Sequence, residues 1–191
     1  MPKLGMEPIR RSALVQATIA EIGQAHSLDV TVGQIAKRAG MSTALAHHYF
    51  GGKDQIFLAA MRHILSDFGS EVCARLKEAR SQRDRAAAII IASFDEKSFA
   101  PATVTAWMTL YAAAPNNAQT KRLLQLYQRR LRSNLTYALR GISAKPMLDA
   151  ETIAALIDGL YLRAALSGTS TANAARACAL STLDLLLADP Q

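Results

Sequence analysis

Hydroxyl, imidazole and ammonium groups are concentrated between residues 31 and 53 of this 191-residue chain. Some of these side chains could donate hydrogen bonds to the phosphate oxygens of a nucleic acid, namely Ser42, His48, Tyr49 and Lys53, and Thr31 is a further candidate for a DNA contact. Others could reach the edges or the methyl groups of DNA bases, namely Thr43, Ala44, Leu45 and His47. These residue types predict a DNA-binding site, provided that the fold presents them on one exposed surface.

A helix-turn-helix would provide that surface. The segment Thr-Val-Gly-Gln at 31–34 has the form of a capping box, and the apolar face of the helix that it starts is formed by Val32, Ile35, Ala36 and Ala39. Gly40 can end this helix, and Ser42 can cap a second helix that runs to Phe50. The pattern predicts a helix-turn-helix at about residues 31–50, although similar helical hairpins occur in proteins that never touch DNA.

The remaining apolar periodicity predicts an all-α protein. We expect a helix at 7–26 before the motif, a long helix from 53 to about 76, and helices at 85–94, 103–114, 120–140, 150–166 and 171–187. Pro101, Pro115 and Pro146 lie between or beside these segments. Residues 1–52 would then form an N-terminal three-helix domain, and residues 53–191 a larger helical domain.

Composition and charge narrow the possible classes of protein. With only 10 Gly and 6 Pro, the chain has too few turn residues for a loop-rich β protein. The net charge of +7 is compatible with a nucleic-acid partner, but residues 1–60 contain six Lys/Arg and four Asp/Glu, so charge does not locate the site. Cys73 and Cys178 have no partner at metal-ligand spacing, which predicts reduced thiols, no metal site and a cytoplasmic location. We also expect no signal peptide and no membrane association, because no apolar run is long enough.

The segment at residues 31–54 resembles a known family. Its sequence, TVGQIAKRAGMSTALAHHYFGGKD, resembles the DNA-binding domain of the TetR family in its IA and AG pairs, its serine cap, its Tyr-Phe ending and the lysine after two glycines. The resemblance implies a homodimer that binds a double-stranded DNA operator with an inverted repeat. It also implies that residues 53–191 bind a small-molecule effector and dimerise through the last two helices.

Four further segments resemble one group within that family, the choline-responsive repressors of glycine betaine synthesis genes. These segments are MPKLGM-x-x-IRR at the start, FDE at 94–96, RRL-x-SNL at 129–135 and AALIDGLYLRAALSG at 154–168. One departure is Tyr161, which stands where tryptophan is expected. The resemblance implies a repressor with a role in osmoprotection that choline releases from DNA, and it implies no cofactor.

A quaternary ammonium cannot donate hydrogen bonds, so aromatic faces and a carboxylate are the groups best suited to hold choline. Trp107 and Tyr111 are one helical turn apart and share a helix face. The other candidates lie on helices that could converge there, namely Phe94, Asp95, Tyr127, Asp158 and Tyr161. Aromatic residues at helical spacing also commonly just fill a core. The carboxylate of Asp158 needs a partner, which would be the ligand cation, Arg163, Arg129 or a residue of a second subunit.

Other interpretations use the same helical fold. The chain could be a TetR-type repressor that responds to another ligand, cationic or lipophilic. It could instead be a helical enzyme or a dimerising adaptor, although it has no H-E-x-x-H motif, P-loop, G-x-S-x-G motif or dinucleotide-binding glycine pattern. The missing motifs favour a regulator that is not an enzyme.

Overall fold

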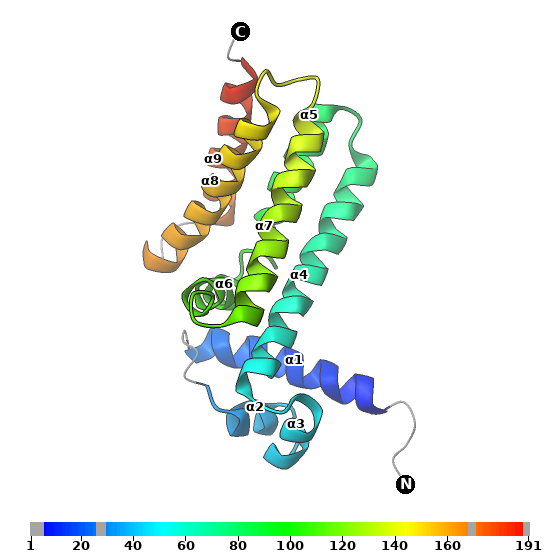
Figure 1. The fold of residues 1–191 in the computed structure, drawn as a ribbon, viewed down its shortest axis with the longest axis vertical. Coiled ribbons are helices and arrows are strands. Elements are labelled where there is room, and N and C mark those ends of the chain that lie inside the picture. The colour runs from blue at the N-terminus through cyan, green and yellow to red at the C-terminus, as the bar shows by residue number, and fades with distance from the viewer. Residues whose placement is uncertain (1–5, 26–29, 168–170, 189–191) are drawn as a thin grey trace.

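The computed structural model describes residues 6–25, 30–167 and 171–188, and within these ranges the chain forms nine α-helices and no strand (Figure 1). The predicted all-α class is therefore confirmed. The expected break after residue 26 and the ends of two quoted motifs, residues 1–5 and 168, lie outside the described ranges.

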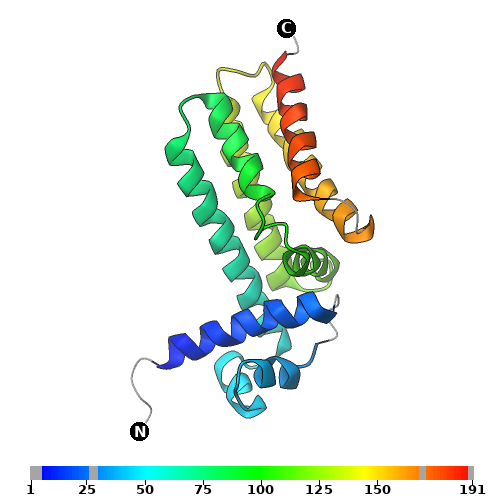
Figure 2. The same cartoon turned by 180° about the vertical axis from the view of Figure 1, so that it is seen from behind.

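Three helices form the N-terminal end of the molecule: α1 (Met6–Ala25), α2 (Val32–Arg38) and α3 (Thr43–Phe50). The apolar face of α1, with Leu14, Ala17 and Ile22 buried, packs against α2, α4 and α6. Both ribbon views show α1 lying across the lower end of the long helices, with α2 and α3 beneath it (Figures 1 and 2).

Four helices form the body: α4 (Lys53–Glu78), α5 (Gln82–Ser93), α6 (Pro101–Ala113) and α7 (Ala118–Leu139). α4, α5 and α7 run side by side, and α6 crosses them near α1 (Figure 1). Every residue of α5 from 86 to 90 is buried, because α4, α7 and α9 enclose this helix. A helix that is apolar on all sides is typical of the centre of a bundle.

The last two helices, α8 (Pro146–Ser167) and α9 (Ala172–Ala188), pack against each other. α8 also packs on α7 and α6, and α9 on α5. Their inward side chains are buried, whereas Leu162, Leu166 and Leu185 are 48%, 79% and 72% exposed. The pair therefore presents an apolar outer face that no described helix covers.

Most helices outside the helix-turn-helix begin one to four residues earlier than the apolar pattern predicts, and three of them show why. α5 begins at Gln82, because Ser81 and Asp84 form a capping box in which the Ser81 hydroxyl accepts from the Asp84 N–H at 3.0 Å. α6 and α8 begin at Pro101 and Pro146 themselves, two and four residues before the expected starts. Proline suits the first position of a helix, where its fixed φ is favourable and no N–H is needed.

No helix in the described ranges has both the length and the apolar character needed to cross a bilayer. The same ranges contain no group of three or more His, Cys, Asp or Glu side chains that could hold a metal ion. Cys73 on α4 and Cys178 on α9 are both exposed.

Candidate functional site

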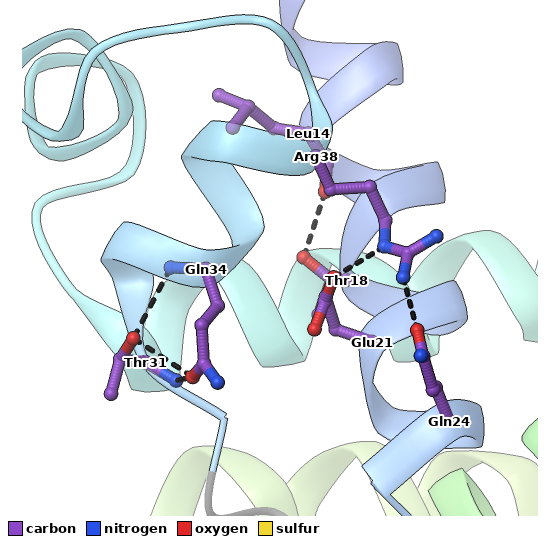
Figure 3. A network of polar contacts seen from close by, with 7 residues as sticks. All are labelled: Leu14, Thr18, Glu21, Gln24, Thr31, Gln34 and Arg38. Atoms are coloured by element: carbon purple, nitrogen blue, oxygen red, sulfur yellow. Dashed lines mark hydrogen bonds and ion pairs between the residues drawn. The ribbon is translucent and has the colours of Figure 1, made fainter.

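α2, the first helix of the helix-turn-helix, is held at both ends (Figure 3). The Thr31 hydroxyl accepts a hydrogen bond from the Gln34 N–H at 3.2 Å, and the Gln34 side chain accepts from the Thr31 N–H at 2.7 Å. This confirms the predicted capping box. At the other end, the Arg38 guanidinium donates to Glu21 and Gln24 of α1. α2 is thereby fixed against α1 and gives α3 a rigid support.

The caps around α3 also match the sequence prediction. Gly40 ends the preceding helix with a φ of 67°, a left-handed conformation that favours glycine. The Ser42 hydroxyl accepts from the Leu45 N–H at 3.2 Å. After α3, Gly51 has a φ of 80°, and the turn that it makes allows α4 to begin at Lys53. These turns fix the direction of α3 relative to its neighbours.

The residues predicted to contact DNA are accessible. Two of them, Leu45 and Tyr49, are half-buried, and the other seven are exposed: Thr31, Ser42, Thr43, Ala44, His47, His48 and Lys53. Ala46, between them, is fully buried against the core. A Cβ built on Gly33 would lie 3.7 Å from the hydroxyl oxygens of both Thr31 and Thr43, so the first residues of α2 and α3 lie close together.

Tyr49 is held from α1, a contact that the sequence analysis missed. Arg10 donates from Nη1 to the Tyr49 hydroxyl at 3.4 Å. The Arg11 guanidinium lies 5.7 Å from the centroid of the Tyr49 ring and 5.1 Å from that of Phe50, within cation–π range. Arg11 also pairs with Glu7 at 2.9 Å. Both arginines belong to the IRR segment, but a contact across 39 residues leaves no periodic signal in the sequence.

In the larger helical part of the molecule, where α6 crosses close to α1, the predicted aromatic residues gather in one cluster. The ring centroids of Trp107 lie 4.4 Å from Tyr127 and 5.9 Å from Tyr111, and Phe94 lies 5.9 Å from Tyr161. Four of these five rings are at most 8% exposed, and Tyr111 is half-buried. The helices converge as expected, but the rings fill the space between them. The cluster has the residue types of a cation site and is closed.

Tyr161 is anchored rather than free to contact a ligand. Its hydroxyl lies 2.5 Å and 3.1 Å from the carbonyl oxygens of Ser93 and Ser98, to which it donates. Burial raises the pKa of Tyr161, and the negative charges of Asp95 and Asp158 raise it further. The residue is therefore a neutral donor that joins α8 to the connection between α5 and α6.

Asp158 has a different partner from those expected. Its Oδ1 accepts a hydrogen bond from the Tyr111 hydroxyl at 2.8 Å, and no arginine pairs with it in the described ranges. Burial raises the pKa of Asp158, and hydrogen bonds from Tyr111 and Gln128 oppose that rise. The expectation of Arg163 or Arg129 as a partner within the subunit is wrong, because the described ranges contain no ion pair of Asp158 and its hydrogen bonds come from Tyr111 and Gln128.

Two open cavities meet at Asp158. The α7–α8 cavity has a volume of about 630 Å³ and a charged lining that includes Arg122, Arg129 and Glu151. The α6–α8 cavity has a volume of about 620 Å³, and its lining of mainly apolar residues consists of Thr105, Met108, Tyr111, Asp158, Gly159, Leu162, Ala165 and Leu166. Tyr111 and Asp158 are thus the two predicted ligand residues that the structure brings together in one open space.

Asp95 is used elsewhere. Its Oδ1 accepts from the Ser98 N–H at 2.6 Å and so stabilises the turn before α6. It lines a groove shared with His63 and Asp67, and neither of the two cavities at Asp158 includes it. The sequence prediction that grouped Asp95 with the other pocket residues overlooked this local turn.

In addition to the continuous helix α4, the packing of α1 on α4 and α6 connects the DNA-binding helices to the larger helical domain. Gly23 of α1 lies so close to Ala102 of α6 that a Cβ at position 23 would overlap the Ala102 side chain and lie 2.9 Å from its Cα. Gln55 of α4 donates to Gln119 of α7 at 2.9 Å. The first contact is the more direct, because α6 also carries Trp107 and Tyr111.

Two family descriptions match the chain. "Bacterial regulatory proteins, tetR family" matches residues 14–60, which include the helix-turn-helix. "BetI-type transcriptional repressor, C-terminal" matches residues 82–188, which include the aromatic cluster and Asp158. The two matches cover both ends of the molecule.

Relatives lead to the same family. An HTH-type transcriptional regulator BetI from Brucella anthropi is 50% identical over 182 residues, 94% of this chain and 93% of the relative. BetI from Rhizobium meliloti is 48% identical over 170 residues, 87% of this chain and 83% of the relative. Because these relatives are transcriptional regulators, the chain is a regulator and not an enzyme.

A transcriptional regulator from Saccharomonospora viridis, solved in complex with choline, has the same fold. It superposes with a TM-score of 0.82 at 19% identity, over 91% of this chain and 95% of that chain. At this identity the likeness concerns the fold alone. The family matches and the identity to the Brucella protein show that this chain belongs to the TetR family and is a DNA-binding transcriptional repressor of the BetI type.

Proposed function

We propose that this repressor controls the genes that convert choline to glycine betaine, and that choline releases it from the operator. The observation that carries the proposal is the half-buried carboxylate of Asp158, which lies beside the aromatic cluster without a cationic partner in the described ranges. A small quaternary ammonium suits such a carboxylate and its aromatic neighbours. The identity to the BetI relatives and the choline-bound structure with the same fold support this ligand.

We propose that choline enters the α6–α8 cavity and places its ammonium between Tyr111 and Asp158. Trp107 stacks behind Tyr111, so its ring is the next face that the cation would meet if the cluster opened. Phe94, Tyr127 and Tyr161 would form the wall of the pocket from their buried positions. Asp95 would act only indirectly, through the turn that holds Tyr161.

On the DNA side, we propose that Thr43 and His47 reach base edges, and that Ala44 and Leu45 pack against thymine methyl groups. The phosphate contacts would come from exposed or half-buried donors, namely Ser42, His48, Tyr49 and Lys53. The Thr31 hydroxyl donates to Gln34 and accepts from it, so its main role would be to position α2.

We propose that the functional unit is a homodimer formed through α8 and α9, which would bind an inverted repeat. Support comes from the outer face of these helices, where Leu162, Leu166 and Leu185 are exposed. An apolar face of this kind is unfavourable in water and favours a four-helix bundle with a second copy. Leu162 and Leu166 also line the α6–α8 cavity, so dimer geometry and ligand binding would be coupled.

We further propose that ligand binding changes the spacing of the two DNA-binding ends. A cation between Tyr111 and Asp158 would shift α6 relative to α8. Because α6 contacts α1 at Gly23, the shift would reach the support of the helix-turn-helix directly as well as through α4. Choline can act in this way only if it binds the two shapes with different affinity.

Reciprocal titrations test the whole proposal. Operator DNA must weaken choline binding by the same factor by which choline weakens operator binding. Choline would be titrated by calorimetry with and without a saturating duplex from the region upstream of the repressor's own gene, and again with Trp107→Ala. Equal choline affinity with and without DNA would reject the coupling, and unchanged affinity in the variant would remove Trp107 from the pocket.

A lipophilic effector is the second candidate. The groove between α4 and α7 has a volume of about 600 Å³, and its lining is more apolar than that of the α7–α8 cavity. Phe68 and Tyr127 lie at this groove, with ring centroids 6.1 Å apart. A lipophilic cation that displaced operator DNA when choline did not would favour this candidate.

A further inference from the structure

Arg10 differs from the other arginines of α1 and α2 in its partner. Arg11 pairs with Glu7 at 2.9 Å, and Arg38 pairs with Glu21. Arg10 has no acidic partner in the described ranges and instead donates to the neutral hydroxyl of Tyr49 at 3.4 Å. Its positive charge is therefore not neutralised locally. Both side chains are half-buried, so each is partly open to a partner from solution.

The Arg10–Tyr49 pair has the donors that an oxyanion requires. The Tyr49 hydroxyl oxygen accepts from Arg10, which leaves its own proton free to be donated. The guanidinium has five N–H groups, and only one of them is used in this contact. The Tyr49 hydroxyl and the positively charged guanidinium of Arg10, with its unused N–H donors, thus lie side by side. A phosphate diester oxygen, which only accepts hydrogen bonds, is a suitable ligand for this set.

We propose that Arg10 and Tyr49 together bind one phosphate of the DNA backbone, so that the DNA-binding surface extends from α3 onto α1. This inference rests on the proposed role of Tyr49 as a phosphate contact. Because Arg10 lies 3.4 Å from the Tyr49 hydroxyl, a phosphate bound by the tyrosine is also within reach of the guanidinium. The contact fixes register and affinity and carries no base preference.

Arg11 is a positioning residue in this arrangement. Its guanidinium lies over the rings of Tyr49 and Phe50, and its pairing with Glu7 holds it there. The stacked cation restricts the Tyr49 ring and keeps its hydroxyl beside Arg10. Glu7 already offsets the charge of Arg11. Arg11 would therefore act mainly by orienting Tyr49 toward the phosphate, and would add little positive charge to the contact.

The salt dependence of DNA binding separates these roles. Affinity for the upstream duplex would be measured by fluorescence anisotropy between 50 and 300 mM KCl for the wild type, Arg10→Gln, Arg11→Gln and Tyr49→Phe. One lost phosphate contact per subunit flattens the slope of log affinity against log salt by about 0.9, or about 1.8 for a dimer. We expect this change for Arg10→Gln, with affinity lower on the order of tenfold near 0.15 M salt. Tyr49→Phe and Arg11→Gln should weaken DNA binding but leave the slope of log affinity against log salt nearly as steep as in the wild type.

Two controls keep the outcomes distinct. Arg140→Gln removes an exposed charge at the far end of α7 and should leave both slope and affinity unchanged. The double variant Arg10→Gln/Tyr49→Phe should lose less than the product of the two single losses, because both residues serve one phosphate. Multiplicative losses in the double variant would overturn the inference. It would also be overturned if Arg10→Gln kept the wild-type salt slope while Lys53→Ala flattened that slope. In either case the proposed DNA contacts of α3 and α4 would still stand. If the wild type does not prefer the upstream duplex, the proposed function itself is wrong.

Discussion

In the DNA-binding part of the molecule most candidate side chains are exposed and are positioned by close neighbours in sequence, whereas in the effector-binding part all are buried or half-buried and most are positioned by residues far away in sequence. The Ser42 cap reaches three residues along the chain. The Tyr111–Asp158 hydrogen bond spans 47 residues, and the bond from Tyr161 to Ser93 spans 68. One end is assembled locally, and the other exists only when α5, α6, α7 and α8 are packed together.

This difference has a consequence for regulation. The exposed surface on α3 can meet DNA without rearrangement. The aromatic cluster has no open space at Trp107, which is 5% exposed, so a cation reaches that ring only if the surrounding helices move. If the ligand enters the open α6–α8 cavity and also contacts Trp107, its binding is coupled to a conformational change, and a repressor needs such a change in order to release DNA.

The largest effect that tests this comparison is expected from Asp158→Asn. Asparagine keeps an acceptor for the Tyr111 hydroxyl and removes the negative charge that would hold the ammonium. We expect choline affinity to fall on the order of a hundredfold, or about 2.7 kcal/mol, with operator affinity unchanged. Thermal unfolding should occur at the same or a higher temperature, because the cost of burying the charge is removed. A calorimetric titration and a melting curve measure both quantities.

The pH dependence checks that the charge itself is responsible. Choline binds the carboxylate, and burial raises the pKa of Asp158, so wild-type affinity should fall as the pH drops through that raised pKa. Asp158→Asn should show no such dependence. Glu151→Gln removes an exposed carboxylate of the same helix and should change choline affinity less than about twofold. If the choline affinity of Asp158→Asn fell with pH as that of the wild type does, Asp158 would not be the group that holds the cation.

An intermediate effect is expected at the junction of the two ends. Gly23→Ala would force α1 and α6 apart, because the new Cβ overlaps Ala102. Overpacking of this kind costs about 1–3 kcal/mol, more than the helix propensity gained. We expect a lower free energy of unfolding in urea and a changed ratio between operator affinities with and without choline.

Gly69→Ala is the matched control for that variant. Gly69 also lies inside a helix, α4, but a Cβ there meets no atom within 4 Å. The substitution should therefore stabilise the protein by about 0.5–1 kcal/mol and leave the coupling unchanged. Equal behaviour of the two alanine variants would contradict a role for the α1–α6 contact.

The smallest effect is expected at the DNA-binding helices, where each substitution removes only one of several separate contacts to DNA. Thr43→Ala removes one hydroxyl and should cost about 1 kcal/mol, or roughly fivefold in affinity, with relaxed preference at one or two base pairs. Lys53→Ala should weaken all sequences alike and flatten the salt slope by about one phosphate's worth per subunit. Operator variants titrated at several salt concentrations separate the two. A changed base preference in Lys53→Ala with an unchanged salt slope would reverse these assignments.

The same contrast between local and distant contacts decided what the sequence could reveal. Thr31, Gly40 and Ser42 carry local capping signals, so the helix-turn-helix could be placed almost to the residue. Ser81 and Asp84 also carry a capping signal for the start of α5, but apolar periodicity alone places that start three residues too late.

The partners of Tyr49 and Asp158 could not be predicted in this way. Arg10 reaches Tyr49, and Tyr111 reaches Asp158, only through the packing of helices that are distant in sequence. The residue types at the effector end indicated a cation site, and five aromatic rings do gather there. Whether those rings enclose a space or fill it depends on helix spacing, which composition and periodicity do not specify.

The enclosure of α5 sets the timescale on which different parts of the repressor can exchange with water. Residues 86–90 are buried and surrounded by three other helices, so their backbone amides can meet solvent only when those helices separate together. We expect hydrogen exchange in α5 to require an opening close to global unfolding, while exposed backbone elsewhere can exchange through smaller local fluctuations. Backbone amides in the centre of α5 should therefore exchange more slowly than exposed amides elsewhere in the protein, and they provide the reference rate for the movements of the other helices.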